Sequence, residues 1–188
     1  MKKENTKAVD FKTAFEYPFH RWVGLLNILW ALLPNVGWLV LNGYVVRIVK
    51  TFIKGQYDKL PKLSFVRDLK LGFWMFVKTI PFGCTFFVVF AVLTFIPIIG
   101  IILQILIGAL ILPMLMINFF KKESVDSSFD ITKTKAVFVN ITDYIMALLK
   151  TIGLAIVFVL MMIVLVGIPA HMFTKNIFLA DFYRRRVD

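Results

Sequence analysis

The chain has 188 residues, of which 60% are hydrophobic and 18% are charged, and 20 of them are phenylalanine. Soluble domains average about 45–50% apolar residues, so this composition excludes a soluble protein and predicts a membrane protein. The net charge is +11 and the basic residues border long apolar runs, which favours anionic membrane lipids as partners and argues against nucleic acid.

Three stretches of the chain contain no Asp, Glu, Lys or Arg. They are residues 22–46, 79–120 and 151–174, with lengths of 25, 42 and 24 residues. A membrane-spanning helix needs about 20 apolar residues, so the middle stretch has room for two spans and each of the others for at least one. The segments outside these stretches are basic on balance. The ratio of Lys and Arg to Asp and Glu is five to three in 1–21, eight to two in 47–78, five to four in 121–150 and four to two in 175–188.

Two all-α topologies fit this pattern. A four-span bundle puts nine basic residues on one face of the membrane and thirteen on the other. Three helical hairpins, with six transmembrane or re-entrant helices, put all 22 on one face, which the positive-inside rule favours. The first and third hairpins are short, because about 12 residues per arm give about 18 Å against a hydrocarbon core of about 30 Å. We prefer the hairpins, with both termini cytoplasmic, and keep the four-span bundle as the alternative.

An internal repeat supports the hairpins. Ala31–Gly37 resembles Thr94–Gly100, and both place Pro-x-x-Gly near the middle of an uncharged stretch, where Pro and Gly break helices. The third stretch has a looser version in Gly167-Ile-Pro169. We therefore predict one membrane domain, 1–188, with pseudo-repeats at 11–55, 63–122 and 130–186.

Each repeat begins with an amphipathic stripe. Such stripes suit either helices lying in the headgroup region or the wet ends of spanning helices, and the sequence leaves both open. The stripes are Phe11, Phe15, Phe19 and Trp22; Val66, Leu69, Phe73, Phe76 and Val77; and Phe138, Ile141, Ile145 and Leu148.

The pattern Asn42-Gly43-Tyr44-Val45-Val46-Arg47, followed by Gly55, Leu60-Pro61 and Gly72, resembles a known family. It is similar to the prokaryotic membrane-protein family catalogued as domain of unknown function 4013, and more remotely to membrane domains attached to some glycerophosphodiester phosphodiesterases. The resemblance implies a multi-span protein in the plasma membrane of a bacterium or archaeon, and no activity.

No catalytic, cofactor or metal motif is present, so we expect a non-enzymatic protein without a cofactor. His20 and His171 are far apart and have no ligand partner at metal-binding spacing. The intramembrane amides Asn27, Asn42 and Gln104 are expected to join helices, and Asn27 and Asn42 to approach one another in the first hairpin.

The sequence favours a scaffold, or a lipid-binding or partner-binding subunit of a membrane complex, acting through its basic face. An anionic lipid surface fits the excess of basic residues in 47–78, and a membrane-protein partner or homo-oligomer is the other candidate. The alternative is a passive channel or a lipid or solute translocator formed by an oligomer. The candidate contact residues are Tyr44, Arg47, Lys50, Lys54, Lys62, Arg67 and Lys70.

Overall fold

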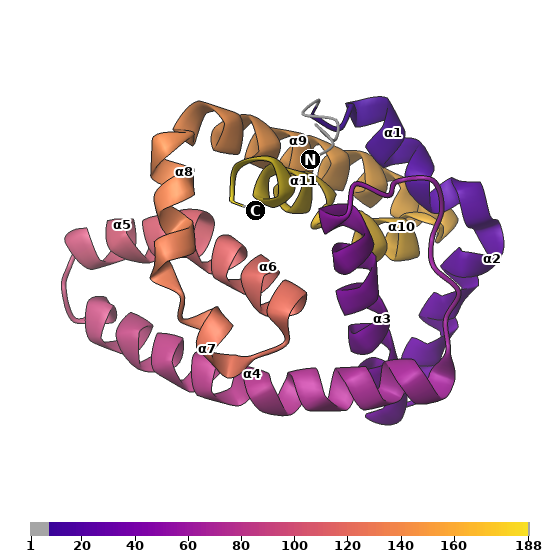
Figure 1. Ribbon diagram of the computed structural model, residues 1–188, viewed down its shortest axis with the longest axis horizontal. Coiled ribbons are helices and arrows are strands. Elements are labelled where there is room, and N and C mark those ends of the chain that lie inside the picture. Colours follow the sequence, from indigo (N-terminus) through magenta and orange to yellow (C-terminus); the bar gives the residue numbers. More distant parts are fainter. Residues whose placement is uncertain (1–7, 188) are drawn as a thin grey trace, which may run out of the picture.

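The computed structural model describes residues 8–187, and the regular structure of this part of the chain is helical, without strands (Figure 1). Four segments within it are long and apolar enough to cross a membrane. The prediction of an all-α, polytopic membrane protein is therefore confirmed. The four segments are Val36–Ile53, Phe65–Thr94, Ile99–Lys122 and Ile141–Ile163.

The helical elements follow one another with short connections, and α3, α4 and α9 are the longest of them. In chain order the elements are α1 (Phe11–Glu16), η1 (Tyr17–Arg21), α2 (Trp22–Leu25), η2 (Leu26–Leu32), α3 (Val36–Ile53), α4 (Phe65–Thr94), α5 (Ile99–Leu106), η3 (Ile107–Ile111), α6 (Leu112–Lys122), α7 (Val125–Ser128), η4 (Ile131–Thr134), α8 (Lys135–Val139), α9 (Ile141–Leu160), η5 (Met161–Val164), α10 (Gly167–Thr174) and α11 (Ile177–Arg186).

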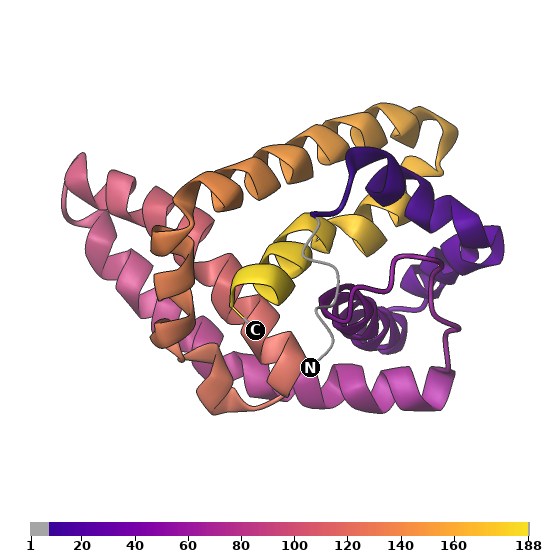
Figure 2. The ribbon, with the colours of Figure 1, turned by 45° about the horizontal axis from the view of Figure 1, so that its top comes forward.

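The core of the molecule is built around α11, which lies among α9, α3 and α6 (Figure 2). Residues 177–183 of this helix are all buried. In contrast, α4 and α5 form a hairpin that projects from one side (Figure 1), and only 6% of the apolar window of Phe65–Thr94 is buried within the chain. The projecting hairpin therefore presents its apolar side chains outward, as a helix surrounded by lipid does.

The chain reverses direction once within each uncharged stretch. Each reversal contains one non-glycine residue in the left-handed region, namely Asn35, Ile98 and Leu165, with φ of 61°, 62° and 61°. In the first two turns the residue before it is the proline of the repeat, Pro34 or Pro97. The predicted breaks thus lie where the chain folds back, which supports the hairpin interpretation.

A glycine follows two residues after each left-handed residue, and it permits a backbone contact across the turn. A Cβ on Gly37 would lie 1.7 Å from the carbonyl oxygen of Trp30, and one on Gly100 would lie 1.9 Å from that of Leu93. Gly167 has the same relation to the carbonyl oxygen of Phe158, at 2.0 Å. The third repeat therefore aligns through its glycine.

Pro169 has no equivalent in the other two turns. It lies two residues after Gly167, inside α10, whereas the prolines of the first two repeats come three residues before their glycines. The Gly167-Ile-Pro169 pattern therefore corresponds to the first two repeats only at its glycine.

Two further glycines set the crossing of α3 and α4. A Cβ on Gly43 would lie 2.0 Å from the carbonyl oxygen of Asp68, and one on Gly72 would lie 1.8 Å from that of Leu39. The two backbones touch at this point, as small residues allow in membrane helices. The contact fixes the angle at which the remaining parts of both helices face each other.

The predicted amphipathic stripes have different environments. The first packs on the protein itself, because the ring of Phe15 stacks 5.7 Å from that of Phe158 and the ring of Phe11 stacks 6.2 Å from that of Phe178. The second belongs to the uninterrupted helix α4, and the third continues from α8 into α9. The second stripe is therefore the end of a long apolar helix.

Candidate functional site

A groove of about 920 Å³ lies between α3 and α4, and basic side chains line most of it. Its α3 wall has residues at spacings of three and four, which places them on one face of that helix. The α4 wall follows the same rule, and the linker between the helices contributes Pro61. The α3 wall consists of Arg47, Lys50, Thr51 and Lys54, and the α4 wall of Arg67, Lys70, Leu71, Trp74 and Lys78.

Arg47 is held in place by an ion pair with a buried carboxylate. Its Nε lies 2.7 Å from Oδ1 of Asp68, and its Nη2 donates to Oδ2 at 3.1 Å. The Asp68 side chain is fully buried and also accepts from the backbone N–H of Ser64 at 2.8 Å. Arg47 in addition donates to the carbonyl of Lys62 at 2.6 Å and lies over the ring of Tyr44. This residue therefore builds the groove wall and has little charge left to attract a ligand.

Glu123 contributes the acid of the groove lining. Its carboxylate pairs with Lys50, and its backbone carbonyl accepts from Lys78 Nζ at 2.7 Å. Glu123 ends α6 with a left-handed φ of 55°. Glu123, at the end of a third helix, is thus bound by a lysine of α3 through its side chain and by a lysine of α4 through its backbone.

Three other basic side chains of the groove are not neutralised in this way. Lys54, Arg67 and Lys70 are exposed, and within residues 8–187 none of them forms a hydrogen bond or an ion pair. They come from both walls, so their positive potentials add within the groove. Such an arrangement favours an anionic ligand.

The sequence predicted five of the groove residues. The structure brings Arg47, Lys50, Lys54, Arg67 and Lys70 together, while the other two candidates lie elsewhere. Tyr44 is buried and donates its hydroxyl hydrogen to the carbonyl of Pro61 at 3.0 Å, and Lys62 is exposed outside the groove.

Sequence reasoning missed Lys78, Trp74 and Glu123. The first two continue the spacing of Arg67 and Lys70 along α4, so a longer helical stripe would have included them. Glu123 gave no signal, because it reaches the groove through the packing of α6.

The intramembrane amides serve mainly to join segments. Gln104 donates to the carbonyl of Phe90 and to the hydroxyl of Thr94, both at 3.2 Å, across the second hairpin. Asn27 interacts with the hydroxyl of Tyr44, and no hydrogen bond among the described residues connects it to Asn42. The predicted approach of the two asparagines stays a prediction.

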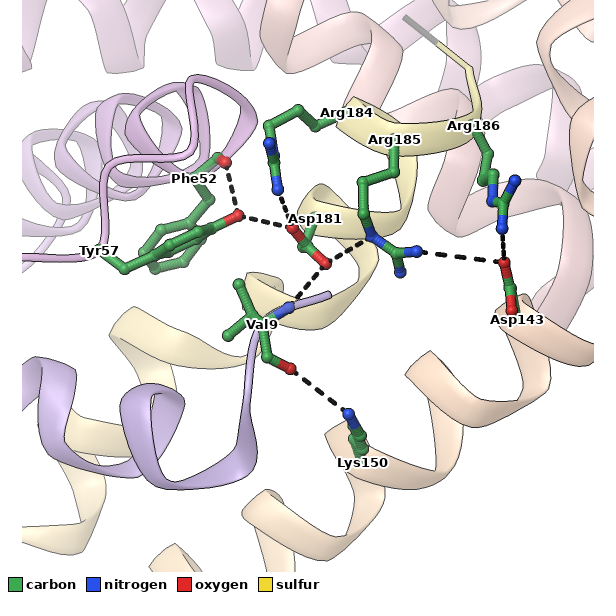
Figure 3. A network of polar contacts seen from close by, with 9 residues as sticks. All are labelled: Val9, Phe52, Tyr57, Asp143, Lys150, Asp181, Arg184, Arg185 and Arg186. Atoms are coloured by element: carbon green, nitrogen blue, oxygen red, sulfur yellow. Dashed lines mark hydrogen bonds and ion pairs between the residues drawn. The ribbon is translucent and has the colours of Figure 1, made fainter. Parts of the chain in front are cut away.

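A second basic cluster surrounds Asp181 on α11 (Figure 3). The Asp181 carboxylate is 2% exposed and accepts from the hydroxyl of Tyr57, the backbone N–H of Val9 and the guanidinium groups of Arg184 and Arg185, at 2.8–3.1 Å. Burial acts to raise the pKa of Asp181, but the bonds from Arg184, Val9 and Arg185 outweigh it and hold the pKa below its usual range.

This cluster joins the charged segments to one another. Lys150 donates to the carbonyl of Val9 at 3.3 Å, and Asp143 pairs with Arg186 (Figure 3). Together with the Tyr57–Asp181 bond, these contacts connect residues from all four charged segments. The Lys50–Glu123 pair adds a direct link between 47–78 and 121–150. No group of three His, Cys, Asp or Glu in residues 8–187 could hold a metal ion.

The model of the family described as "protein of unknown function (DUF4013)" matches residues 26–167. The chain belongs to this family. The match includes both walls of the groove and all three turns, and it confirms the family to which the Gly-Tyr-x-x-Arg pattern pointed. Searches of curated proteins and of solved structures each found no match, so the remoter similarity to glycerophosphodiester phosphodiesterase membrane domains has no support.

Proposed function

We propose that this chain is a non-enzymatic membrane module that binds anionic phospholipid headgroups in the groove between α3 and α4. The observation that carries the proposal is the set of unpaired basic side chains, Lys54, Arg67 and Lys70, which two crossed helices direct into one groove. Basic pockets between membrane helices bind phosphate-bearing headgroups, and each Lys or Arg near an anionic surface contributes about 1 kcal/mol.

The position of the groove along α4 supports a lipid as the ligand. Lys78 is the last charged residue before the uncharged stretch 79–120, so the groove lies where α4 leaves the hydrocarbon. Trp74 lines the groove and is 50% exposed, and the neighbouring Phe73 and Phe76 are also exposed. Trp is enriched at this level of the bilayer, and an acyl chain could follow the apolar side of the helix.

We further propose that the groove faces the cytoplasm and that both ends of the chain lie on the same side. The direct contacts of Asp181 with Val9 and Tyr57, and of Lys150 with Val9, support this orientation. In the four-span alternative, residues 1–21 and 175–188 would lie across the membrane from 47–78 and 121–150, where such contacts could not form. A bacterial or archaeal plasma membrane is the setting that the positive-inside rule favours.

The channel alternative receives less support from the described residues. Gln104 uses its amide within its own hairpin, and Asn118 bonds the carbonyl of Ser127 and the hydroxyl of Tyr183. These side chains are therefore committed to packing and do not line a polar path through one protomer.

A thermal-stability titration tests the proposed function. The protein, purified in a neutral detergent, would be titrated with phosphatidylglycerol or with phosphatidylcholine. We expect phosphatidylglycerol alone to raise the melting temperature, because binding to the folded state stabilises it. The Arg67→Gln/Lys70→Gln variant should lose this response.

The matched control is the Lys59→Gln/Lys62→Gln variant, which removes the same charge from exposed positions outside the groove. It should respond to phosphatidylglycerol as the unmodified protein does. An equal response to both lipids, or an equal loss in both double variants, would contradict a specific lipid site.

A further inference from the structure

The groove carries more positive charge than one phosphodiester can balance. Six basic side chains line it, against the single acid Glu123. Asp68 neutralises Arg47 from behind the wall, and Glu123 pairs with Lys50. Four basic groups, Lys54, Arg67, Lys70 and Lys78, are then without a carboxylate partner among the described residues, whereas a one-phosphate headgroup such as phosphatidylglycerol brings one negative charge.

The Glu123 contacts show that the groove has more than one anion position. The chain's own Glu123 carboxylate is bound by Lys50, and Lys78 donates to the backbone carbonyl of the same residue. The unpaired cations Lys54, Arg67 and Lys70 define a second position, since they line the same groove but make no contact with Glu123. A volume of about 920 Å³ is at the upper end of the range for small-ligand sites, so two phosphate groups can be accommodated together.

We infer that the groove is selective for a lipid whose headgroup carries two phosphate groups, and that Glu123 competes with the ligand for one of the two anion positions. This inference rests on the proposed function and specifies its ligand class. One phosphate binds to Lys54, Arg67 and Lys70, and the other binds to Lys50 in place of the Glu123 carboxylate. The Glu123 carboxylate is a displaceable partner, because its side chain is 35% exposed and pairs with Lys50 alone among the described residues.

The experiment compares lipids at equal phosphate concentration. Native mass spectrometry of the detergent-solubilised protein would measure the dissociation constants of phosphatidylcholine, phosphatidylglycerol and diphosphatidylglycerol, which carries two phosphates. We expect diphosphatidylglycerol to bind at least about fivefold more tightly per phosphate than phosphatidylglycerol, the factor that one additional basic contact supplies. Equal affinity per phosphate would overturn the inference and leave the proposed function standing. No preference for either anionic lipid over phosphatidylcholine would overturn both.

Two substitutions separate the two anion positions. Glu123→Gln removes the competing charge at nearly constant shape, so it should tighten diphosphatidylglycerol binding about fivefold and leave phosphatidylglycerol nearly unchanged. Lys50→Gln should weaken diphosphatidylglycerol binding by a similar factor, while Lys59→Gln should not. If Glu123→Gln strengthens the binding of both lipids equally, or of neither, the role of Glu123 as a competitor is refuted. The melting temperature of each variant, measured without lipid, shows whether it is folded.

A soluble probe distinguishes a headgroup from a free phosphate compound. Inorganic diphosphate carries two phosphate groups and at least the charge of the headgroup, without the acyl chains that would follow Trp74 and the exposed face of α4. We expect it to bind more weakly than diphosphatidylglycerol by at least about tenfold. Equal or tighter binding of diphosphate would overturn the lipid as the source of the phosphates.

Discussion

The two basic clusters of this protein differ in what balances their charge. Around Asp181, the arginines of α11 converge on one buried carboxylate, which also accepts from Tyr57 and Val9. In the groove, basic residues from α3 and α4 outnumber their acids, and three of them are exposed without an ion-pair partner in residues 8–187. The comparison teaches that a basic cluster with a central buried acid holds the fold, whereas one that lacks sufficient acid is available for a ligand.

The largest effect should come from removing the charge of Asp181. Asp181→Asn removes the buried carboxylate that pairs with Arg184 and Arg185, and breaking a buried ion pair costs about 3–5 kcal/mol of stability. Chemical unfolding in detergent measures this change. Asp58→Asn removes an exposed carboxylate and should change stability by less than about 0.5 kcal/mol. Similar effects of the two substitutions would show that the Asp181 cluster is not a structural lock.

A smaller loss of stability is expected when a side chain is added at the crossing that shapes the groove. In Gly72→Ala, the new Cβ would meet the carbonyl oxygen of Leu39, so α3 and α4 must separate at a cost of about 2–3 kcal/mol. Lipid binding in the groove should weaken as well. Gly83→Ala is the control, because a Cβ on Gly83 of the same helix meets nothing within 4 Å. An unchanged unfolding curve for Gly72→Ala would refute the close crossing.

Acid should weaken the Asp181 cluster only at the low end of the pH range. Because the folded-state pKa of Asp181 lies below its usual value of about 3.9, its contribution to stability is complete above the usual pKa. That contribution is lost as the pH falls through the lower, folded-state pKa. Melting temperatures measured between pH 6 and about pH 3 should therefore decline at the acid end. The decline should be shallower in Asp181→Asn. If the melting temperatures of the variant and of the unmodified protein fall equally with pH, other groups cause the loss of stability in acid.

The smallest effect on stability is expected in the groove. Arg67→Gln/Lys70→Gln removes two exposed charges that have no ion pair in the described structure, so the free energy of unfolding should change by less than about 0.5 kcal/mol. Relief of repulsion between the basic residues could even raise it slightly. A loss above about 1 kcal/mol, measured as for Asp181→Asn, would mean that these side chains support the fold, which would remove the contrast between the clusters.

The sequence predicted the turns well because they have a local cause. Proline and glycine at 34–37 and 97–100 lie in runs without charge, and the chain turns there whatever surrounds it. The same reasoning found the α3 wall of the groove, since Arg47, Lys50 and Lys54 share one helix face by spacing alone. It also led to the family, through short patterns on α3 and the linker.

What the sequence could not predict depends on contacts between distant segments. Because Asp181 lies in a segment rich in arginine, the sequence indicates a solvated helix end. The structure instead buries residues 177–183 of α11, because α3, α6 and α9 pack around this helix. Glu123 reads as a loop residue and reaches the groove only through the direction of α6.

The central place of α11 has a consequence for how this protein is made. During synthesis, α3, α4, α6 and α9 all leave the ribosome before α11, so the cavity that this helix fills is exposed while the apolar segments are already entering the bilayer. The hydrogen bond from the Val9 backbone N–H to Asp181 can also form only after α11 has been synthesised. Insertion and final folding must therefore be separate events, and an intermediate with its helices in the membrane but its interior unfilled would be the species that a membrane-protein protease encounters.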